Sequence, residues 1–200
     1  AGSSSVYGNS AVLPKREDMR PNPLTPYALQ KLVAEQYCQM FTRLYGLETV
    51  TTRYFNVFGP RQQPGSPYSG VISLFIDALA NRRQPTIHGD GRQTRDFTYV
   101  GDVVRGVLAA CTAPDVAGEV FNVAVGGRIS LLELYGTLQR IFDVEIEPVF
   151  GPPREGDVRD SQADIARARE KLGFEPQMSF EDGLRATVDW YRSTTAGVPR

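Results

Sequence analysis

A tyrosine and a lysine stand four residues apart at the start of the clearest helical segment of the sequence. Residues 26–45 carry apolar side chains at helical spacing, follow Thr25, which can cap a helix, and are ended by Gly46. Tyr27 and Lys31 therefore share one face of the first two turns. Because a nearby ammonium favours phenolate over phenol, the pair has the chemistry of a general acid and base. The spacing also fits an ordinary surface pair, so other residues must decide.

A run of three hydroxyls, Ser3, Ser4 and Ser5, precedes Val6 and Tyr7 near the start of the chain. Exposed hydroxyls beside a β-type dipeptide are typical of the end of a strand. We expect this segment to be the tip of a central strand whose beginning lies outside the 200 residues.

The elements that must position these groups alternate along the chain. Helical patterns cover 26–45, 70–83, 98–113, 131–142, 163–173 and 179–194, and strand-like segments cover 46–55, 84–91, 118–125 and 144–150. Ser130 and Glu133 form a capping box at the start of 131–142. The near-continuous apolar character of 118–125 is typical of a parallel strand buried on both faces. The alternation predicts a mixed α/β fold, although no glycine-rich dinucleotide loop follows an N-terminal strand.

Composition excludes several classes of protein. With 41% hydrophobic and 22% charged residues, the chain is typical of globular proteins and not of disordered or fibrous ones. Twenty-two basic and 23 acidic residues give a net charge of −1, which provides no electrostatic attraction to nucleic acid. No apolar run approaches the roughly 18 residues of a membrane span, and no signal peptide is recognisable. We expect a cytoplasmic location and no membrane partner.

Cysteine and histidine are too sparse for a metal centre. Cys38 and Cys111 stand in helical segments without CxxC spacing or a cluster of histidines. We expect two buried, free thiols rather than a disulfide or a zinc site. His88, the only histidine, is expected in a loop without a catalytic role.

Five segments occur in the order and approximate spacing of one family: SSSVYG, PYALQK, RYFNVFGPRQ, GDGRQTRDFTYVGDVV and REGDVRDSQADI. From Ser3 to about Tyr191, the chain resembles the extended short-chain dehydrogenase/reductases, in the NAD-dependent epimerase/dehydratase group. It is most similar to the UDP-glucose and UDP-N-acetylglucosamine 4-epimerases.

The resemblance implies a partial Rossmann-like parallel sheet with a small α/β substrate-binding subdomain. In this family the glycine-rich NAD loop precedes the serine motif, so the chain resembles the C-terminal portion of the enzyme. Residues 1–60 would belong to the NAD-binding domain. Residues 61–200 would form mainly the nucleotide-sugar subdomain, with about 96–125 returning to the Rossmann sheet.

The family pattern assigns Ser3, Tyr27 and Lys31 as the catalytic residues, with Tyr27 and Lys31 also contacting NAD. Ser3 would hydrogen-bond the 4-hydroxyl of the sugar, and Ser4 and Ser5 would continue the floor of the substrate pocket. Dehydratases of the group carry an acidic pair where Ser4 and Ser5 stand, so the two serines favour an epimerase.

Further residues are assigned to cofactor and substrate. Tyr54 and Phe55 would pack beside the nicotinamide, and Asn56 would contact the sugar diphosphate. Arg95 and Arg154 match the family's two phosphate-binding arginines, whose guanidinium groups suit a diphosphate.

Two more positions concern the nucleotide and the sugar. Asp157 matches an acid that binds the ribose. Ser161 would line the sugar pocket, where a small side chain leaves room for an N-acetyl group. Asp96 and Asp102 are expected to have structural roles.

The implied reaction is 4-epimerisation of a UDP-sugar, either UDP-GlcNAc/UDP-GalNAc or UDP-glucose/UDP-galactose. Tyr27 would take the proton of the 4-hydroxyl while hydride leaves C4 for NAD, and the transient 4-keto sugar would receive hydride on its other face. Two alternatives stay open. One is a nucleotide-sugar decarboxylase or reductase on the same scaffold, and the other is a non-catalytic UDP-sugar-binding fragment.

The helix at 26–45 has a second implied role. In the family it forms half of an intersubunit helix bundle, which predicts a homodimer. Its apolar residues could instead pack on the sheet of the same chain, and periodicity does not separate these possibilities. We also expect the chain to be marginally stable when it lacks an N-terminal half, because apolar surface and a sheet edge would be exposed.

Overall fold

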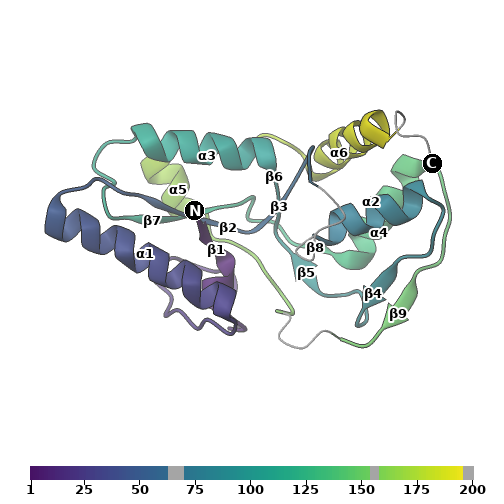
Figure 1. Cartoon of the computed structure of the whole chain (residues 1–200), viewed down its shortest axis with the longest axis horizontal. Helices are drawn as coiled ribbons and strands as arrows, with labels where there is room; N and C mark the ends of the chain where they lie inside the picture. Colours follow the sequence, from purple (N-terminus) through teal and green to yellow (C-terminus); the bar gives the residue numbers. More distant parts are fainter. Residues whose placement is uncertain (63–69, 154–157, 196–200) are drawn as a thin grey trace.

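A computed structural model describes residues 1–62, 70–153 and 158–195 and places them in two lobes (Figure 1). The first lobe contains the strands β1, β2 and β7 with the short helix η1 and the helices α1, α3 and α5, and the second contains the remaining elements, with the β3/β6 pair at the junction. The bounds are β1 Gly2–Ser3, η1 Ser4–Tyr7, α1 Pro26–Tyr45, β2 Thr51–Tyr54, β3 Asn56–Phe58, α2 Val71–Ala80, β4 Thr86–His88, β5 Thr94–Arg95, β6 Phe97–Tyr99, α3 Val100–Thr112, β7 Val120–Val123, β8 Ile129–Ser130, α4 Leu131–Phe142, β9 Val149–Gly151, α5 Ala166–Leu172 and α6 Phe180–Thr195.

The first lobe is built on a parallel sheet with the strand order β1-β2-β7. Gly2 pairs with Arg53, and Thr52 pairs with Phe121. In Figure 1, α1 lies on one side of these strands and α3 on the other. Alternate residues of β2 face the two helices, as the two-residue period of a strand requires. Parallel strands with helices on both faces define a Rossmann-like α/β layering, which confirms the expected fold class.

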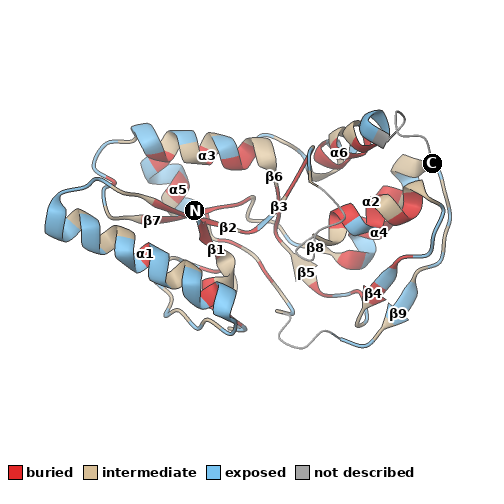
Figure 2. Ribbon diagram, in the orientation of Figure 1, coloured by how far each residue is buried: buried red, intermediate tan, exposed pale blue. Residues whose placement is uncertain are grey.

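Helix α1 has the predicted bounds, because both of its end signals are local. The Thr25 hydroxyl accepts a hydrogen bond from the Ala28 amide at 3.2 Å, and Gly46 adopts the left-handed conformation that ends the helix. Only Ala28 and Glu35 of α1 are buried (Figure 2). Most of its apolar residues therefore do not pack on the sheet, although Leu32 packs against the buried cluster that includes Val6 and Tyr7. The exposed apolar residues of α1 are Leu29, Val33, Tyr37, Met40, Phe41 and Leu44.

The second lobe has its own apolar core between α2, α4 and α6. Phe75, Leu134 and Leu184 are almost fully buried in this core. The predicted capping box of α4 is present, since the Ser130 hydroxyl and the Glu133 carboxylate each accept a hydrogen bond from the other's backbone amide. Parallel pairing of β4 with β9 and antiparallel pairing of β5 with β8 complete the lobe.

Several sequence-based expectations differ from the structure. The strands β2 and β9 are shorter than the predicted segments 46–55 and 144–150, because pairing occurs only where a partner strand runs alongside. The residues before Val100 form β6 rather than the first turn of a helix. His88 ends β4 instead of lying in a loop.

The two cysteines are free, as expected, but they are not both buried. Cys38 is half-buried and Cys111 is exposed. Cys111 lies on the same outer face of α3 as the exposed Val104 and Leu108. The buried face of α3 passes through Val103, Gly106 and Ala110.

Candidate functional site

A pocket at the carboxyl end of β1 brings together seven of the predicted site residues: Ser3, Ser4, Ser5, Phe55, Asn56, Arg95 and Ser161. We call it the serine pocket. It has a volume of about 280 Å³, and its lining is completed by Tyr7, Gly8, Lys15, Val158 and Asp160. Four separate segments of the chain contribute the predicted residues. Ligands of open α/β sheets bind at the carboxyl ends of the strands, where this pocket lies.

The hydroxyl of Ser3 is oriented by Ser5. The Ser5 hydroxyl donates to Ser3 Oγ at 2.9 Å, and the Ser5 amide donates to the same oxygen at 3.2 Å. A serine hydroxyl has two acceptor positions and one proton to donate. Since both acceptor positions of Ser3 are used, its own proton is available for an acceptor in the serine pocket.

The floor of the pocket requires a glycine after the serine segment. Gly8 has a φ of +58°, and a Cβ at this position would lie 2.0 Å from the carbonyl oxygen of Asn22. Only glycine fits both the conformation and the space. The chain can therefore turn sharply directly after the residues that line the pocket.

The opposite wall is held by the buried carboxylate of Asp96. Its oxygens accept hydrogen bonds from the amides of Val125, Gly126 and Ala163 at 3.1, 2.9 and 3.1 Å. These bonds join three segments, one of which also carries Ser161. Burial raises the pKa of Asp96 to about 6, although the three amide bonds oppose the rise. Asp96 thus has the expected structural role.

Asp102 also has the expected structural role. It is buried at the first turn of α3, where it accepts hydrogen bonds from the amides of Gln177 and Met178 at 2.8 and 3.2 Å. Arg105 pairs with the same carboxylate. Asp102 therefore attaches α3 to the loop before α6.

Lys15 is a pocket residue that sequence reasoning missed. Its side chain is almost fully buried, and its ammonium donates to the carbonyl oxygens of Ser10 and Val12, the latter at 2.9 Å. Burial lowers the pKa of Lys15. No carboxylate within the described parts of the chain forms an ion pair with it. Lys15 stands in the loop before α1 and belongs to none of the sequence motifs, so the sequence alone did not indicate that it lines the pocket.

Tyr27 and Lys31 lie together on α1, outside the set of residues that line the serine pocket. The Lys31 ammonium is 5.8 Å from the centroid of the Tyr27 ring and donates to the carbonyl oxygen of Ala1 at 3.1 Å. The Tyr27 side chain is about half exposed, at 52%. Lys31 therefore connects the start of α1 with the residue that precedes β1.

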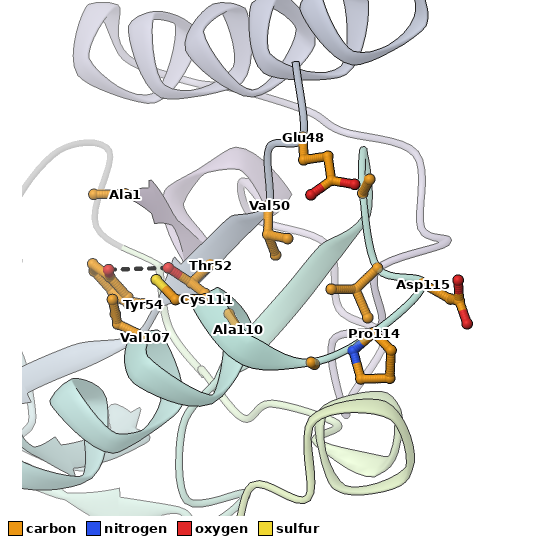
Figure 3. Close-up of a pocket in the computed structure, with 13 residues that line it drawn as sticks. Ala1, Glu48, Val50, Thr52, Tyr54, Val107, Ala110, Cys111, Pro114 and Asp115 are labelled. Atoms are coloured by element: carbon orange, nitrogen blue, oxygen red, sulfur yellow. Dashed lines mark hydrogen bonds between the residues drawn. The ribbon is translucent and has the colours of Figure 1, made fainter. Parts of the chain in front are cut away.

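Tyr54 faces a different pocket from Phe55. This sheet-edge pocket has a volume of about 710 Å³ and lies between β2, α3 and the loop after α3, with Ala1 at its margin (Figure 3). The Thr52 hydroxyl donates to the Tyr54 hydroxyl at 3.0 Å. Since neighbouring residues of a strand point to opposite faces, Tyr54 and Phe55 cannot share the serine pocket.

The remaining expectations concern residues and groups beyond these pockets. Arg154 and Asp157 lie outside the described residues. Among the described residues, no group of acidic, histidine and cysteine side chains is arranged to hold a metal ion. No helix in the same part of the chain is both long and apolar enough to cross a membrane.

The layered sheet and a polar pocket at its strand ends define the chain as a Rossmann-like α/β protein. The model of the NAD dependent epimerase/dehydratase family matches residues 1–124. The chain belongs to this family.

Individual relatives agree with this membership. UDP-glucose 4-epimerase of Mycolicibacterium smegmatis is 41% identical over 189 residues, which are 94% of this chain and 60% of the relative. The structure of UDP-glucose 4-epimerase from Thermotoga maritima with UDP-glucose has a TM-score of 0.93 at 40% identity, covering 97% of this chain and 62% of that one. UDP-N-acetylglucosamine 4-epimerase from Methanobrevibacter ruminantium, in complex with UDP-N-acetylmuramic acid, has a TM-score of 0.92 at 39% identity, covering 96% and 62%. The chain thus spans about three fifths of the length of these relatives.

Proposed function

We propose that the chain carries the substrate-binding and acid/base residues of an NAD-dependent UDP-sugar 4-epimerase. The observation that carries the proposal is the serine pocket, which gathers hydroxyl, amide and guanidinium groups from four segments at the end of a parallel strand. These are the groups that a sugar and a diphosphate require. The similarity to two UDP-sugar 4-epimerases of known structure supports the same activity.

The proposed acid/base residues are Ser3, Tyr27 and Lys31. Ser3 donates its free proton to the oxygen at C4 of the sugar, because Ser5 occupies both of its acceptor positions. Tyr27 accepts and returns the proton of the 4-hydroxyl, and the ammonium of Lys31 lies 5.8 Å from the centroid of its ring.

NAD fits the chemistry of the exposed groups on α1. The half-exposed phenol of Tyr27 and the nearby ammonium of Lys31 offer a hydroxyl and N–H donors suited to a ribose and an amide. We propose that these two residues, together with Phe55, hold the nicotinamide end, whereas Tyr54 faces the sheet-edge pocket on the opposite face of β2. When bound, NAD supplies the acceptor and donor of hydride for C4.

The substrate is proposed to lie along the pocket from sugar to nucleotide. Ser4, Ser5 and Ser161 contact the sugar, while Asn56 and Arg95 contact the diphosphate. Arg154 and Asp157 are proposed to bind the second phosphate and the ribose. Ser161 is small, which favours a substrate with an N-acetyl group at C2 of the sugar.

A second candidate function is favoured by Lys15. Among the described residues the buried ammonium of Lys15 has two carbonyl partners, and it would gain a charged partner from a carboxylate on the sugar. This suits a uronic acid substrate, as a decarboxylase on the same scaffold would require. Binding of UDP-glucuronate at least tenfold tighter than UDP-glucose, lost in the Lys15→Met variant, would favour this candidate.

Partners and organisation complete the proposal. The exposed apolar face of α1 supports a homodimer through residues 26–45. We propose that residues 1–60 complete a NAD-binding domain and that 61–200 form mainly the substrate subdomain, with 96–125 returning to the sheet. The pairing of β7 with β2 supports this return. A cytoplasmic location stays a prediction from the sequence.

The proposal is tested by calorimetric titration of the 200-residue chain with UDP-GlcNAc, UDP-glucose and NAD, followed by an epimerase assay. We expect UDP-sugar binding that is weakened at least tenfold by Arg95→Ala. Binding of UDP-sugar without NAD would leave the chain as a substrate-binding portion that is inactive alone. Absence of UDP-sugar binding would contradict the assignment of the serine pocket.

A further inference from the structure

We propose that Arg53 is a positioning residue that holds the segment carrying Ser3 and the helix carrying Tyr27 in one fixed register. Its consequence for catalysis rests on the function proposed above, whereas the coupling itself rests on the contacts of Arg53. Arg53 lies in the central strand β2 and is only 2% exposed.

One side of the Arg53 guanidinium contacts Glu35 of α1. Arg53 Nε and Nη2 donate to the two carboxylate oxygens of Glu35 at 2.9 and 2.6 Å. Two parallel bonds to one carboxylate fix its orientation as well as its distance. Glu35 follows Lys31 by four residues and Tyr27 by eight, so the three side chains share a helical face. The ion pair thereby sets the height and rotation of α1 on the sheet.

The other side of the guanidinium contacts Tyr7, in the turn that begins at Ser3. Arg53 Nη1 donates to the hydroxyl of Tyr7 at 2.8 Å, and the guanidinium carbon is 4.8 Å from the centroid of the Tyr7 ring. Tyr7 is the last residue of η1, whose N-cap is Ser3. The Tyr7 hydroxyl in turn donates to Asn122 Oδ1 on β7 at 2.7 Å. The turn is therefore held against β2 and β7 from beneath the serine pocket.

A single side chain thus connects the two segments that supply the proposed acid/base residues. Arginine is suited to this because its planar fork can serve Glu35 and Tyr7 together, which a lysine ammonium cannot do with the same geometry. A buried ion pair often adds little stability compared with apolar residues of the same volume. The ion pair of Arg53 with Glu35 and the hydrogen bond of Arg53 to Tyr7 together fix the position of η1 relative to α1.

Three variants separate the contact of Arg53 with α1 from its contact with η1. Tyr7→Phe removes the hydroxyl that accepts from Arg53 and donates to Asn122, and Glu35→Gln removes the carboxylate charge that pairs with Arg53 on α1. Arg53→Lys keeps the positive charge but removes the fork. Arg167→Lys is the matched control, because Arg167 also pairs with a carboxylate beside the same sheet, that of Glu119, and touches neither segment.

Amide hydrogen exchange on the intact protein that contains these 200 residues is the first measurement. We expect Tyr7→Phe to speed exchange about tenfold at the amides of Ser5 and Gly8, which are hydrogen-bonded within the turn. Glu35→Gln should speed exchange in the first three turns of α1, and Arg53→Lys should do so in both segments. Equal loss of protection across the whole lobe, or no change in Arg53→Lys, would overturn the proposal.

Steady-state kinetics provide the second measurement. We expect Tyr7→Phe to lower kcat about tenfold without changing the KM for the UDP-sugar, because geometry and not substrate affinity is altered. In a Ser3→Ala background, Tyr7→Phe should cause no further loss. Full additivity of the two losses would show that Tyr7 does not act through Ser3. If the wild-type protein shows no epimerase activity, the proposed function fails, and the exchange measurement still decides the coupling.

Discussion

Replacing Asp96 with asparagine probes the charge state of the carboxylate that holds the pocket wall. Asp96 is fully buried and accepts three amide hydrogen bonds. An asparagine side chain has one acceptor oxygen and an amino group that cannot accept a hydrogen bond. At least one of the three amides would therefore lose its partner, at a cost of about 1–3 kcal/mol.

The pH dependence of this cost follows from the raised pKa. Burial raises the pKa of Asp96 from the ordinary 3.8 to about 6, which corresponds to about 3 kcal/mol at about 1.4 kcal/mol per pKa unit. Between these two values the unfolded chain has lost the proton and the folded chain keeps it. The contribution of Asp96 to the free energy of unfolding is thus largest below pH 4, falls as the pH rises, and levels off above the folded pKa of about 6.

The assay is urea unfolding of the wild type and of the Asp96→Asn variant at several pH values from 4 to 7.5. We expect the wild type's excess stability over the variant to shrink by about 2.4 kcal/mol across this range, which begins just above the unfolded pKa, since the variant has no proton to lose at this position. Asp160→Asn is a control that should change little over this range, because the hydrogen bond from Thr94 helps lower the pKa of Asp160 below its ordinary 3.8, so this carboxylate is largely ionised in both states at these pH values. A constant difference for Asp96→Asn, or one that grows with pH, would show that the three amides keep the carboxylate ionised and would refute the reasoning.

Three further outcomes are expected. Ser5→Ala should lower kcat about tenfold, because Ser3 loses the hydrogen bond from the Ser5 hydroxyl and regains a free acceptor position. Ser5→Thr keeps a hydroxyl and should retain activity. Equal activity in both variants would contradict the proposal that Ser5 orients the Ser3 hydroxyl. Ser161→Tyr should weaken binding of UDP-GlcNAc about tenfold more than that of UDP-glucose, and an equal loss measured by calorimetry would remove the size argument. A double change of Tyr37 and Phe41 to glutamate should leave the protein monomeric in sedimentation experiments, while an unchanged dimer would place the interface elsewhere.

The elements with local end signals were predictable from the sequence. The helix α1 begins after Thr25 and ends before Gly46, as the capping hydroxyl and the glycine indicated. The capping box at Ser130 likewise set the start of α4. Strand ends were less predictable, because a strand extends only as far as its partner, and partners come from distant parts of the chain.

Seven of the predicted site residues line the serine pocket, whereas Tyr27, Lys31 and Tyr54 do not. Ordered motifs indicated the residues that meet in the serine pocket. The contacts that orient them were not visible, because Arg53 is separated from Glu35 by 18 residues and from Tyr7 by 46. Lys15 belongs to no motif, and its burial depends on the fold of a loop. Cys111 was expected to be buried because helical spacing alone does not reveal which face of a helix is covered.

Helix α1 is suitable for redesign because few of its side chains are buried against its own chain. Its two buried residues, Ala28 and Glu35, are one heptad apart, which is about 10 Å along the helix axis. The outer face contributes little to the fold of its own chain, so complementary charges could be placed at Val33 and Met40 of two different copies. If the proposed homodimer through residues 26–45 forms, such pairs would permit obligate heterodimers in which one copy carries the Tyr27→Phe change. Comparing these with uniform dimers would test whether the proposed sites of the two copies act independently.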